Sequence, residues 1–205
     1  SNVDYSVPVL RGPNDYGFDY SYILPASLDM PPYLFLENHL AVDSRMVLTS
    51  DVYKEKLDNT EYAWDKKHTK PGDVYWRKGV WWRKGEISES FRIENCLPEI
   101  VNQGITFMER QKSVRGAAPK DRTNPFFLYL PLSGPHTPWM PTSEFQGKTS
   151  IGDYGDFVLQ IDHVVGEVVN TLKQIGEWEN TILIFASDNG AYWPEEEIAL
   201  QNHDS

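Results

Sequence analysis

The sequence predicts an α/β fold in which a mixed, mostly parallel sheet is flanked by helices. Three observations support this prediction: an apolar run at residues 126–132, a second at 182–186, and a long amphipathic segment between them. Strand, helix and strand in this order are typical of a parallel pair joined by a right-handed crossover. Both strands then end at the same edge of the sheet, where the binding sites of open α/β sheets form.

The size and composition of the chain indicate one folded domain. A chain of 205 residues with 40% hydrophobic residues can bury a core, so we expect a single domain over 1–205, loop-rich over 1–90 and with a helix–strand–helix–strand core over 91–205. The net charge of −11 argues against nucleic acid as a general partner, because phosphate binding requires a basic face. No apolar run approaches the ~18 residues of a membrane helix, so no membrane partner is expected.

The N-terminal half offers few regular elements. Residues 1–40 are rich in Tyr, Pro and Asp, which favours turns, although the alternating run at 32–37 is typical of a strand. A cluster of tryptophans and cations lies between Lys66 and Lys84. Such a cluster can bind nucleic acid or sulfated sugar by stacking and charge. The acidity of the whole chain favours a plainer interpretation, a solvated excursion whose tryptophans pack onto the domain.

The predicted core elements lie in the second half. Residues 98–112 predict a helix, because Pro98 suits a first turn and the apolar residues fall near one face. Residues 113–124 are polar and predict a loop. Residues 153–176 predict the longest helix, with apolar side chains at three- and four-residue spacing and Gly176 as its C-terminal stop.

Polar side chains follow both predicted strands. Asp188 and Asn189 come directly after the second strand, and their oxygens are ligands that Ca²⁺ or Mg²⁺ accepts. Gly190 allows the chain to turn sharply away from such a ligand. Taken alone, Asp-Asn-Gly is more often an ordinary turn. The preceding strand and the histidine-containing loop upstream reverse that preference.

The upstream loop contains His136 between prolines that limit its conformations. An imidazole held there either binds an oxyanion, acts in acid–base catalysis, or bonds a loop carbonyl as a structural group. Trp139 either flanks a substrate or covers the core. On the predicted helix, Asp162 either supports the site or bonds a neighbouring loop, and His163 is expected at the surface.

Four segments together resemble the sulfatase family, the arylsulfatase-like branch of the alkaline-phosphatase-like superfamily: Tyr16 to Tyr20, Phe126 to Pro141, Leu159 to Gly166 and Thr181 to Gly190. The resemblance implies a sulfuric ester hydrolase acting on a sulfated small molecule or glycan. It implies that Asp188 and Asn189 bind a divalent metal, usually Ca²⁺, and that His136 contacts the sulfate. Asn189 favours a sulfatase over related phosphatases and phosphodiesterases, which often have His there. The family is commonly periplasmic or secreted, and residues 1–6 lack the features of a signal peptide.

The resemblance also defines what is missing. Complete sulfatases use a formylglycine nucleophile made from the Cys or Ser of a Cys-x-Pro-x-Arg signature. Cys96 matches only the beginning of this pattern, because Ile100 stands where Arg is required, so Cys96 is expected to be structural. A paired-Asp strand that would complete the metal site is also absent from the sequence, and metal binding is expected to be weak.

Two functions from different classes therefore remain. The first is the middle portion of an arylsulfatase-like hydrolase, an incomplete catalytic domain that is inactive alone. The alternative is a non-catalytic module that binds sulfated glycan through the cluster between Lys66 and Lys84. Without further central strands the predicted sheet exposes its edges, so we expect self-association or completion of the sheet by a partner.

Overall fold

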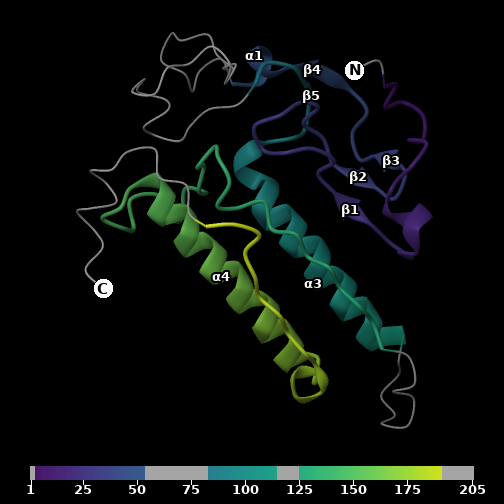
Figure 1. Ribbon diagram of the computed structural model, residues 1–205, viewed down its shortest axis with the longest axis vertical. Coiled ribbons are helices and arrows are strands. Elements are labelled where there is room, and N and C mark those ends of the chain that lie inside the picture. The colour runs from purple at the N-terminus through teal and green to yellow at the C-terminus, as the bar shows by residue number, and fades with distance from the viewer. Residues whose placement is uncertain (1–2, 54–82, 115–124, 191–205) are drawn as a thin grey trace.

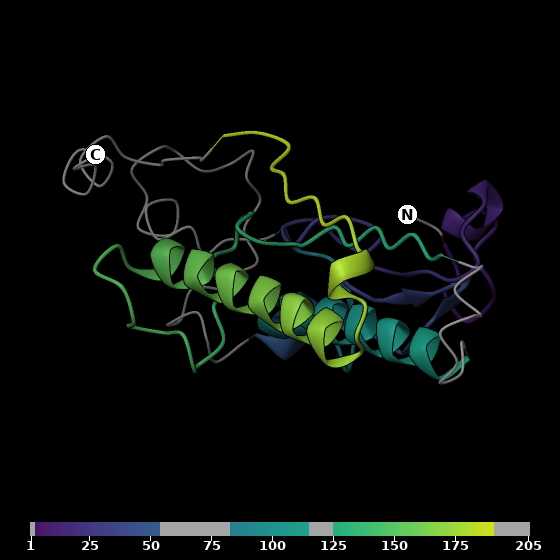
Figure 2. The ribbon, with the colours of Figure 1, turned by 90° about the horizontal axis from the view of Figure 1, so that it is seen from below.

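A computed structural model describes residues 3–53, 83–114 and 125–190 of the chain (Figure 1). Two long helices, α3 (Cys96–Val114) and α4 (Asp153–Gln174), lie side by side and form one layer. The N-terminal sheet and two extended segments, residues 125–132 and 181–186, lie against one side of this layer (Figure 2). Both helices agree with the sequence prediction within two residues at each end.

The strands are short and form two antiparallel sheets. The first has the order β1 (Tyr22–Ile23), β2 (Leu36–Glu37) and β3 (Leu40–Ala41). The second pairs β4 (Met46–Leu48) with β5 (Glu86–Ser88). The remaining short helices are η1 (Pro13–Tyr16), α1 (Thr49–Val52), η3 (Ile93–Asn95) and η4 (Trp178–Asn180).

The end of α4 shows why the helix stops where the sequence predicts. Gly176 has a φ of +76°, a left-handed conformation that side chains disfavour. The amide of Gly176 donates to the carbonyl of Lys173 at 3.1 Å, and that of Glu177 donates to the carbonyl of Leu172 at 2.9 Å. This pair of bonds is a Schellman motif, which satisfies the last carbonyls of a helix.

The core lies between the two helices and the segments that cover them. Apolar side chains from α3, α4 and the N-terminal part pack into one cluster, which includes Tyr33, Phe91, Leu97, Val101, Trp139, Phe157 and Val164. Gly104 of α3 is buried, and a Cβ atom there would lie 3.0 Å from Cδ1 of Leu130. The missing side chain therefore allows residues 125–132 to pack closely on α3.

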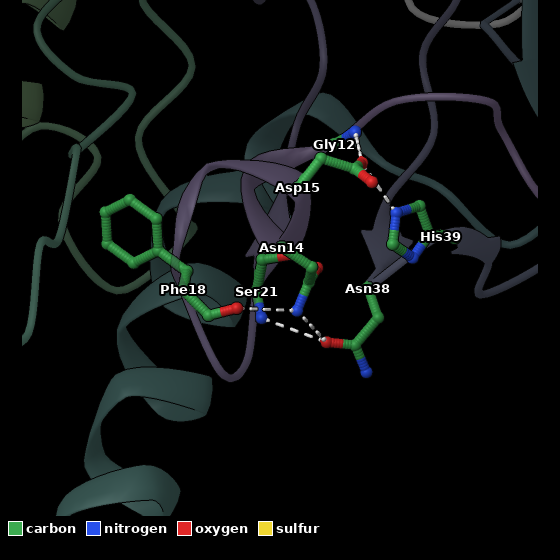
Figure 3. A network of polar contacts seen from close by, with 7 residues as sticks. All are labelled: Gly12, Asn14, Asp15, Phe18, Ser21, Asn38 and His39. Atoms are coloured by element: carbon green, nitrogen blue, oxygen red, sulfur yellow. Dashed lines mark hydrogen bonds and ion pairs between the residues drawn. The ribbon is translucent and has the colours of Figure 1, made fainter.

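A polar network ties the N-terminal turn to the β2–β3 hairpin (Figure 3). One Asp15 carboxylate oxygen accepts the Gly12 amide at 2.7 Å and lies 2.9 Å from Nε2 of His39. The His39 contact and the Gly12 amide lower the pKa of Asp15. In the hairpin turn, Asn38 has a φ of +54°, and its Oδ1 accepts from Nδ2 of Asn14 and the amide of Ser21, each at 3.1 Å.

The prediction of a mostly parallel sheet is not met by the described residues. Their two sheets are antiparallel, and parallel pairing is limited to one isolated bridge between Tyr33 and Ile87. Runs 126–132 and 182–186 are extended but belong to neither sheet, and the strand predicted at 32–37 is reduced to β2. The reason is physical: an extended run becomes a strand only when a neighbouring strand pairs with its backbone. Here such a neighbour is not among the described residues.

The structure does not test two of the predictions made from the sequence. The single-domain assignment of residues 1–205, with its parts 1–90 and 91–205, stays a prediction. The cluster between Lys66 and Lys84 lies outside the described residues, apart from Arg83 and Lys84. Among the helices of the described part, none combines the length and apolarity that crossing a membrane requires.

Candidate functional site

The candidate residues follow two extended segments that end near the N-terminal ends of α3 and α4. Residues 125–132 run back along α3, and 181–186 run back along α4, so both segments point the same way (Figures 1 and 2). Each then reaches the end of the helix pair at which α3 and α4 begin. The loop after the first segment carries His136, and the turn after the second carries Asp188 and Asn189. The common direction of the two runs is as the sequence predicts.

The imidazole of His136 is exposed and held by its own loop. Its Nδ1 lies 2.6 Å from the carbonyl oxygen of Thr137, and a carbonyl can only accept, so Nδ1 carries the proton. In the neutral ring Nε2 is then the acceptor, and in the protonated ring it is a second donor. The loop is anchored to α4, because a Cβ atom on Gly134 would lie 3.0 Å from side-chain atoms of both Phe157 and Ile161.

Trp139 is buried in the core with 5% of its surface exposed. Its Nε1 donates to the carbonyl of Pro135 at 3.0 Å, and its ring meets that of Tyr154 edge-on at 5.0 Å. These contacts fix the shape of the loop around His136. The contact between Trp139 and a substrate that the sequence suggests stays a prediction, and the burial of the ring leaves only a small edge for it.

The Asp188–Asn189 turn is exposed in the described part of the chain. Ser187 Oγ donates to the carbonyl of Asn189 at 2.6 Å, and Nδ2 of Asn189 donates to the carbonyl of Gly190 at 2.8 Å. These local bonds engage the amide nitrogen of Asn189 and leave its Oδ1 as the acceptor. The Asp188 carboxylate and this Oδ1 are two oxygen donors on adjacent residues, a donor set that Ca²⁺ or Mg²⁺ accepts.

The thiol of Cys96 lies in an environment that disfavours its thiolate form. Cys96 is fully buried at the start of α3, and burial raises the pKa of the thiol to about 12. A thiol with so high a pKa holds almost no thiolate near neutral pH. The burial agrees with a structural role for Cys96, which stays a prediction from the sequence.

A carboxylate that sequence analysis did not single out fixes the neighbouring loop. Asp156, buried near the start of α4, accepts the amides of Gly147 at 2.6 Å and Thr149 at 2.7 Å. Burial alone would raise its pKa, but these donors outweigh burial and lower it. The sequence suggested that Asp162 bonds a neighbouring loop. In the structure Asp156 makes such a contact, and Asp162 is exposed. The sequence feature that could have pointed to Asp156 is its place in the first turn of a predicted helix, where acidic side chains are favoured.

The candidate residues do not form a complete metal site by themselves. Within the described residues, no three His, Cys, Asp or Glu side chains are grouped so as to hold a metal ion. Asp188 and Asn189 therefore supply a part of a ligand set. His163, expected at the surface, is exposed and lies 3.8 Å from Glu167 on the same helix.

Comparison with known proteins gives the family. A sequence model of the sulfatase family, described as "Sulfatase", matches residues 55–205, which is more than half of the chain. The chain is 29% identical over 202 residues to an N-acetylgalactosamine-6-O-sulfatase of Bacteroides thetaiotaomicron, covering 91% of this chain and 37% of that protein. It is 41% identical over 117 residues to the N-acetylgalactosamine-6-sulfatase of Rattus norvegicus, covering 54% of this chain and 21% of that protein.

A solved structure supports the same relationship. It comes from work on the metabolism of multiple glycosaminoglycans by Bacteroides thetaiotaomicron, and it matches 91% of this chain and 39% of its own with a TM-score of 0.65 and 27% identity. The chain thus spans less than two fifths of the length of these relatives. The motifs at His136 and Asp188 both fall within the matched residues 55–205, and this chain belongs to the sulfatase family.

Proposed function

We propose that this chain forms the middle part of an arylsulfatase-like enzyme that hydrolyses sulfate esters on glycans, with 6-sulfated N-acetylgalactosamine as the substrate class. One observation carries the proposal: the loop of His136 and the turn of Asp188–Asn189 follow two extended segments that end at the same end of the helix pair (Figure 1). The substrate class is supported by relatives named as N-acetylgalactosamine-6-sulfatases.

The metal would be held through Asp188 and Asn189. Their carboxylate and amide oxygens fit Ca²⁺ better than a softer ion, because Ca²⁺ prefers hard oxygen ligands. When bound, such an ion polarises a sulfate oxygen and stabilises the charge that develops on it. Since Ca²⁺ takes about six to eight oxygens, the proposal requires further ligands from outside the described residues.

His136 would act on the sulfate group itself. With Nδ1 bonded to the carbonyl of Thr137, Nε2 is the nitrogen that would contact the sulfate group. A protonated imidazole donates a charge-assisted hydrogen bond to a sulfate oxygen, which orients the ester and stabilises negative charge. Trp139 and Gly134 keep this ring in place through the loop, so they are positioning residues.

The nucleophile lies outside these 205 residues in this proposal. Cys96, the single cysteine, is buried, and Ile100 stands where the formylglycine signature requires Arg. We therefore expect the isolated chain to release no sulfate from aryl sulfates or sulfated sugars. Turnover by the purified 205-residue chain, dependent on formylglycine, would contradict the proposal.

The native protein isolated from its source cells tests the function directly. We expect an intact mass well above the 23.6 kDa of this chain, together with release of sulfate from 6-sulfated N-acetylgalactosamine. In that protein Asp188→Asn and His136→Ala should each lower kcat/KM by about 100-fold or more, whereas Glu109→Gln, at an exposed position of α3, should change it little. A native mass near 23.6 kDa, with no hydrolysis, would overturn the proposal in favour of a glycan-binding module.

A further inference from the structure

The turn after the second extended segment contains an asparagine followed directly by a glycine. Asn189–Gly190 is the one Asn-Gly pair in the sequence, and both residues are exposed. In such a pair the backbone nitrogen of the second residue can attack the side-chain carbonyl carbon of the first. Glycine favours this attack, because it carries no side chain to hinder the approach. The pair therefore has the covalent arrangement that spontaneous deamidation requires.

The side chain of Asn189 is folded back over the peptide that would attack it. Its Nδ2 donates to the carbonyl of Gly190 at 2.8 Å. Cγ, the carbon bonded to Nδ2, is thereby held beside the backbone of Gly190 and does not extend into solvent. Groups held at short range react without much of the entropy cost of bringing them together. This contact favours ring closure between the two residues.

A hydroxyl group polarises the same peptide. Ser187 Oγ donates at 2.6 Å to the carbonyl oxygen of Asn189, in the peptide group whose nitrogen belongs to Gly190. When that nitrogen loses its proton, resonance places part of the negative charge on the carbonyl oxygen. A hydrogen bond to this oxygen stabilises the charge, as donors do in an oxyanion hole. In the described part of the chain the Gly190 amide donates to no acceptor, so removal of its proton breaks no hydrogen bond.

Two asparagines in other turns lack this combination. The amide that follows Asn180 donates to the carbonyl of Trp178 at 3.3 Å. The amide that follows Asn14 donates to the carbonyl of Gly12 at 3.1 Å. In both places the next residue also carries a side chain. Attack on these asparagines would break a hydrogen bond and meet steric hindrance, so we expect both to persist.

We propose that Asn189–Gly190 is a spontaneous modification site at which position 189 becomes aspartate or isoaspartate. The Gly190 nitrogen forms a bond to Cγ of Asn189, the bond between Cγ and Nδ2 breaks, and Nδ2 leaves as ammonia with the proton of the Gly190 amide. Water then opens the cyclic imide. Opening at the carbonyl from the side chain gives aspartate. Opening at the carbonyl from the main chain gives isoaspartate, in which the main chain runs through the former side chain.

The modification changes the oxygen donors of this turn. Aspartate at position 189 replaces a neutral amide oxygen with a carboxylate beside that of Asp188. Isoaspartate lengthens the main chain before Gly190 by one carbon atom. The affinity of a Ca²⁺ site depends on the charge of its ligands and on its rigidity, so both products would alter metal binding by this turn. The modification itself requires no metal and does not rest on the proposed function.

Peptide mapping by mass spectrometry tests this inference on the 205-residue chain, sampled over days near neutral pH and at physiological temperature. We expect an amide NH₂ to be replaced by OH at position 189, in two products that chromatography separates, while Asn14 and Asn180 stay unchanged. The same chain unfolded in urea gives the rate without the contacts of the turn. The folded chain should react about two- to tenfold faster, the equivalent in rate of one hydrogen bond.

Variants of the turn separate the contributions. Ser187→Ala removes the hydroxyl donor and should slow the reaction of the folded chain about two- to tenfold. Gly190→Ala should slow it by at least the same factor, because the added methyl group hinders the attacking nitrogen. A Cβ atom on Gly190 would meet no described atom within 4 Å beyond its chain neighbours, so this variant should keep the fold. Ser44→Ala, at an exposed position of the N-terminal part, is the matched control and should leave the rate unchanged.

Three results would overturn the site: no product at position 189 in the folded chain, a slower reaction in the folded chain than in urea, or an unchanged rate in Ser187→Ala. Its failure can be told from that of the proposed function, because the two are measured separately. Absence of the products, beside a native protein that hydrolyses the sulfate ester, removes the modification site alone. Products that depend on Ser187, beside a native protein without hydrolysis, support the site and remove only the enzymatic proposal.

Discussion

At the scale of single residues, the structure shows the burial and the hydrogen-bond partners of side chains, which the sequence does not give. The proline-rich loop predicted a held imidazole at His136, but only the 2.6 Å contact with the carbonyl of Thr137 assigns the proton to Nδ1. The burial of Trp139 makes it a support of the loop, and its contact with a substrate stays a prediction. Asp156 was not foreseen, because its loop partners, Gly147 and Thr149, are identified only by tertiary contact.

Asp156→Asn should destabilise the chain at neutral pH. The folded-state pKa of Asp156 lies below its ordinary value, so its contribution is present above pH 4 and is lost as the pH falls through the folded pKa. Replacing the charged acceptor should lower the free energy of unfolding by about 1–3 kcal/mol at pH 7, and the difference should shrink near pH 3. Urea unfolding at both pH values measures this. Asp162→Asn, at an exposed position, is the control. An equal effect of both substitutions would contradict the assignment.

The thiol of Cys96 should resist alkylation in the folded chain. Its burial and the pKa of about 12 leave neither access nor thiolate near neutral pH. We expect iodoacetamide to label it slowly in buffer and rapidly in urea above the unfolding midpoint. Mass spectrometry of the intact chain measures the labelled fraction over time. Fast labelling in buffer would show that Cys96 is accessible and would reopen its role.

At the scale of elements, the two long helices could be predicted, whereas the pairing of the extended segments could not. The apolar periodicities at 98–112 and 153–176 led directly to α3 and α4, because a helix satisfies its backbone within itself. The runs 126–132 and 182–186 have an equally clear apolar pattern but no ladder in the described residues. Strand pairing depends on a second segment, so local sequence cannot guarantee it.

Two glycines in helix interiors should respond in opposite directions. A Cβ atom on Gly104 would lie 3.0 Å from Leu130, whereas one on Gly166 would meet nothing within 4 Å. Gly104→Leu should therefore lower the free energy of unfolding by about 1–3 kcal/mol through overpacking. Gly166→Ala should raise it by roughly 0.5–1 kcal/mol through helix propensity. Thermal unfolding by circular dichroism compares them. Tolerance of Gly104→Leu would mean that residues 125–132 do not pack on α3 as described.

At the scale of the whole molecule, the outward faces of the two extended segments carry unusual apolar exposure. Phe127 is 77% exposed, Tyr129 66%, Ile182 91% and Ile184 84%. An aromatic side chain can bury about 150–250 Å² on its own. The faces are therefore comparable with the largest apolar patches of monomers, roughly 300–600 Å², which usually mark contact surfaces.

The isolated chain should consequently self-associate. Exposed extended backbone with apolar side chains pairs readily with a second copy. We expect light scattering after size exclusion to give a mass above 23.6 kDa at micromolar concentration. The double substitution Ile182→Lys with Ile184→Lys should shift it toward the monomer, because charges on such a face oppose pairing. Val158→Lys, on the exposed side of α4, is the control. A clean monomer of the unmodified chain would contradict this expectation.

The sequence alone determined the helices, the direction of the chain between them and the family-specific motifs, since these depend on local periodicity and on short runs of residues. It also predicted a structural role for Cys96, and the burial of this residue agrees with that role. The tertiary structure alone decided the tautomer of His136, the burial of Trp139 and the role of Asp156. Each of these depends on which distant groups meet, and the backbone and side-chain contacts that bring them together are made only when the chain folds.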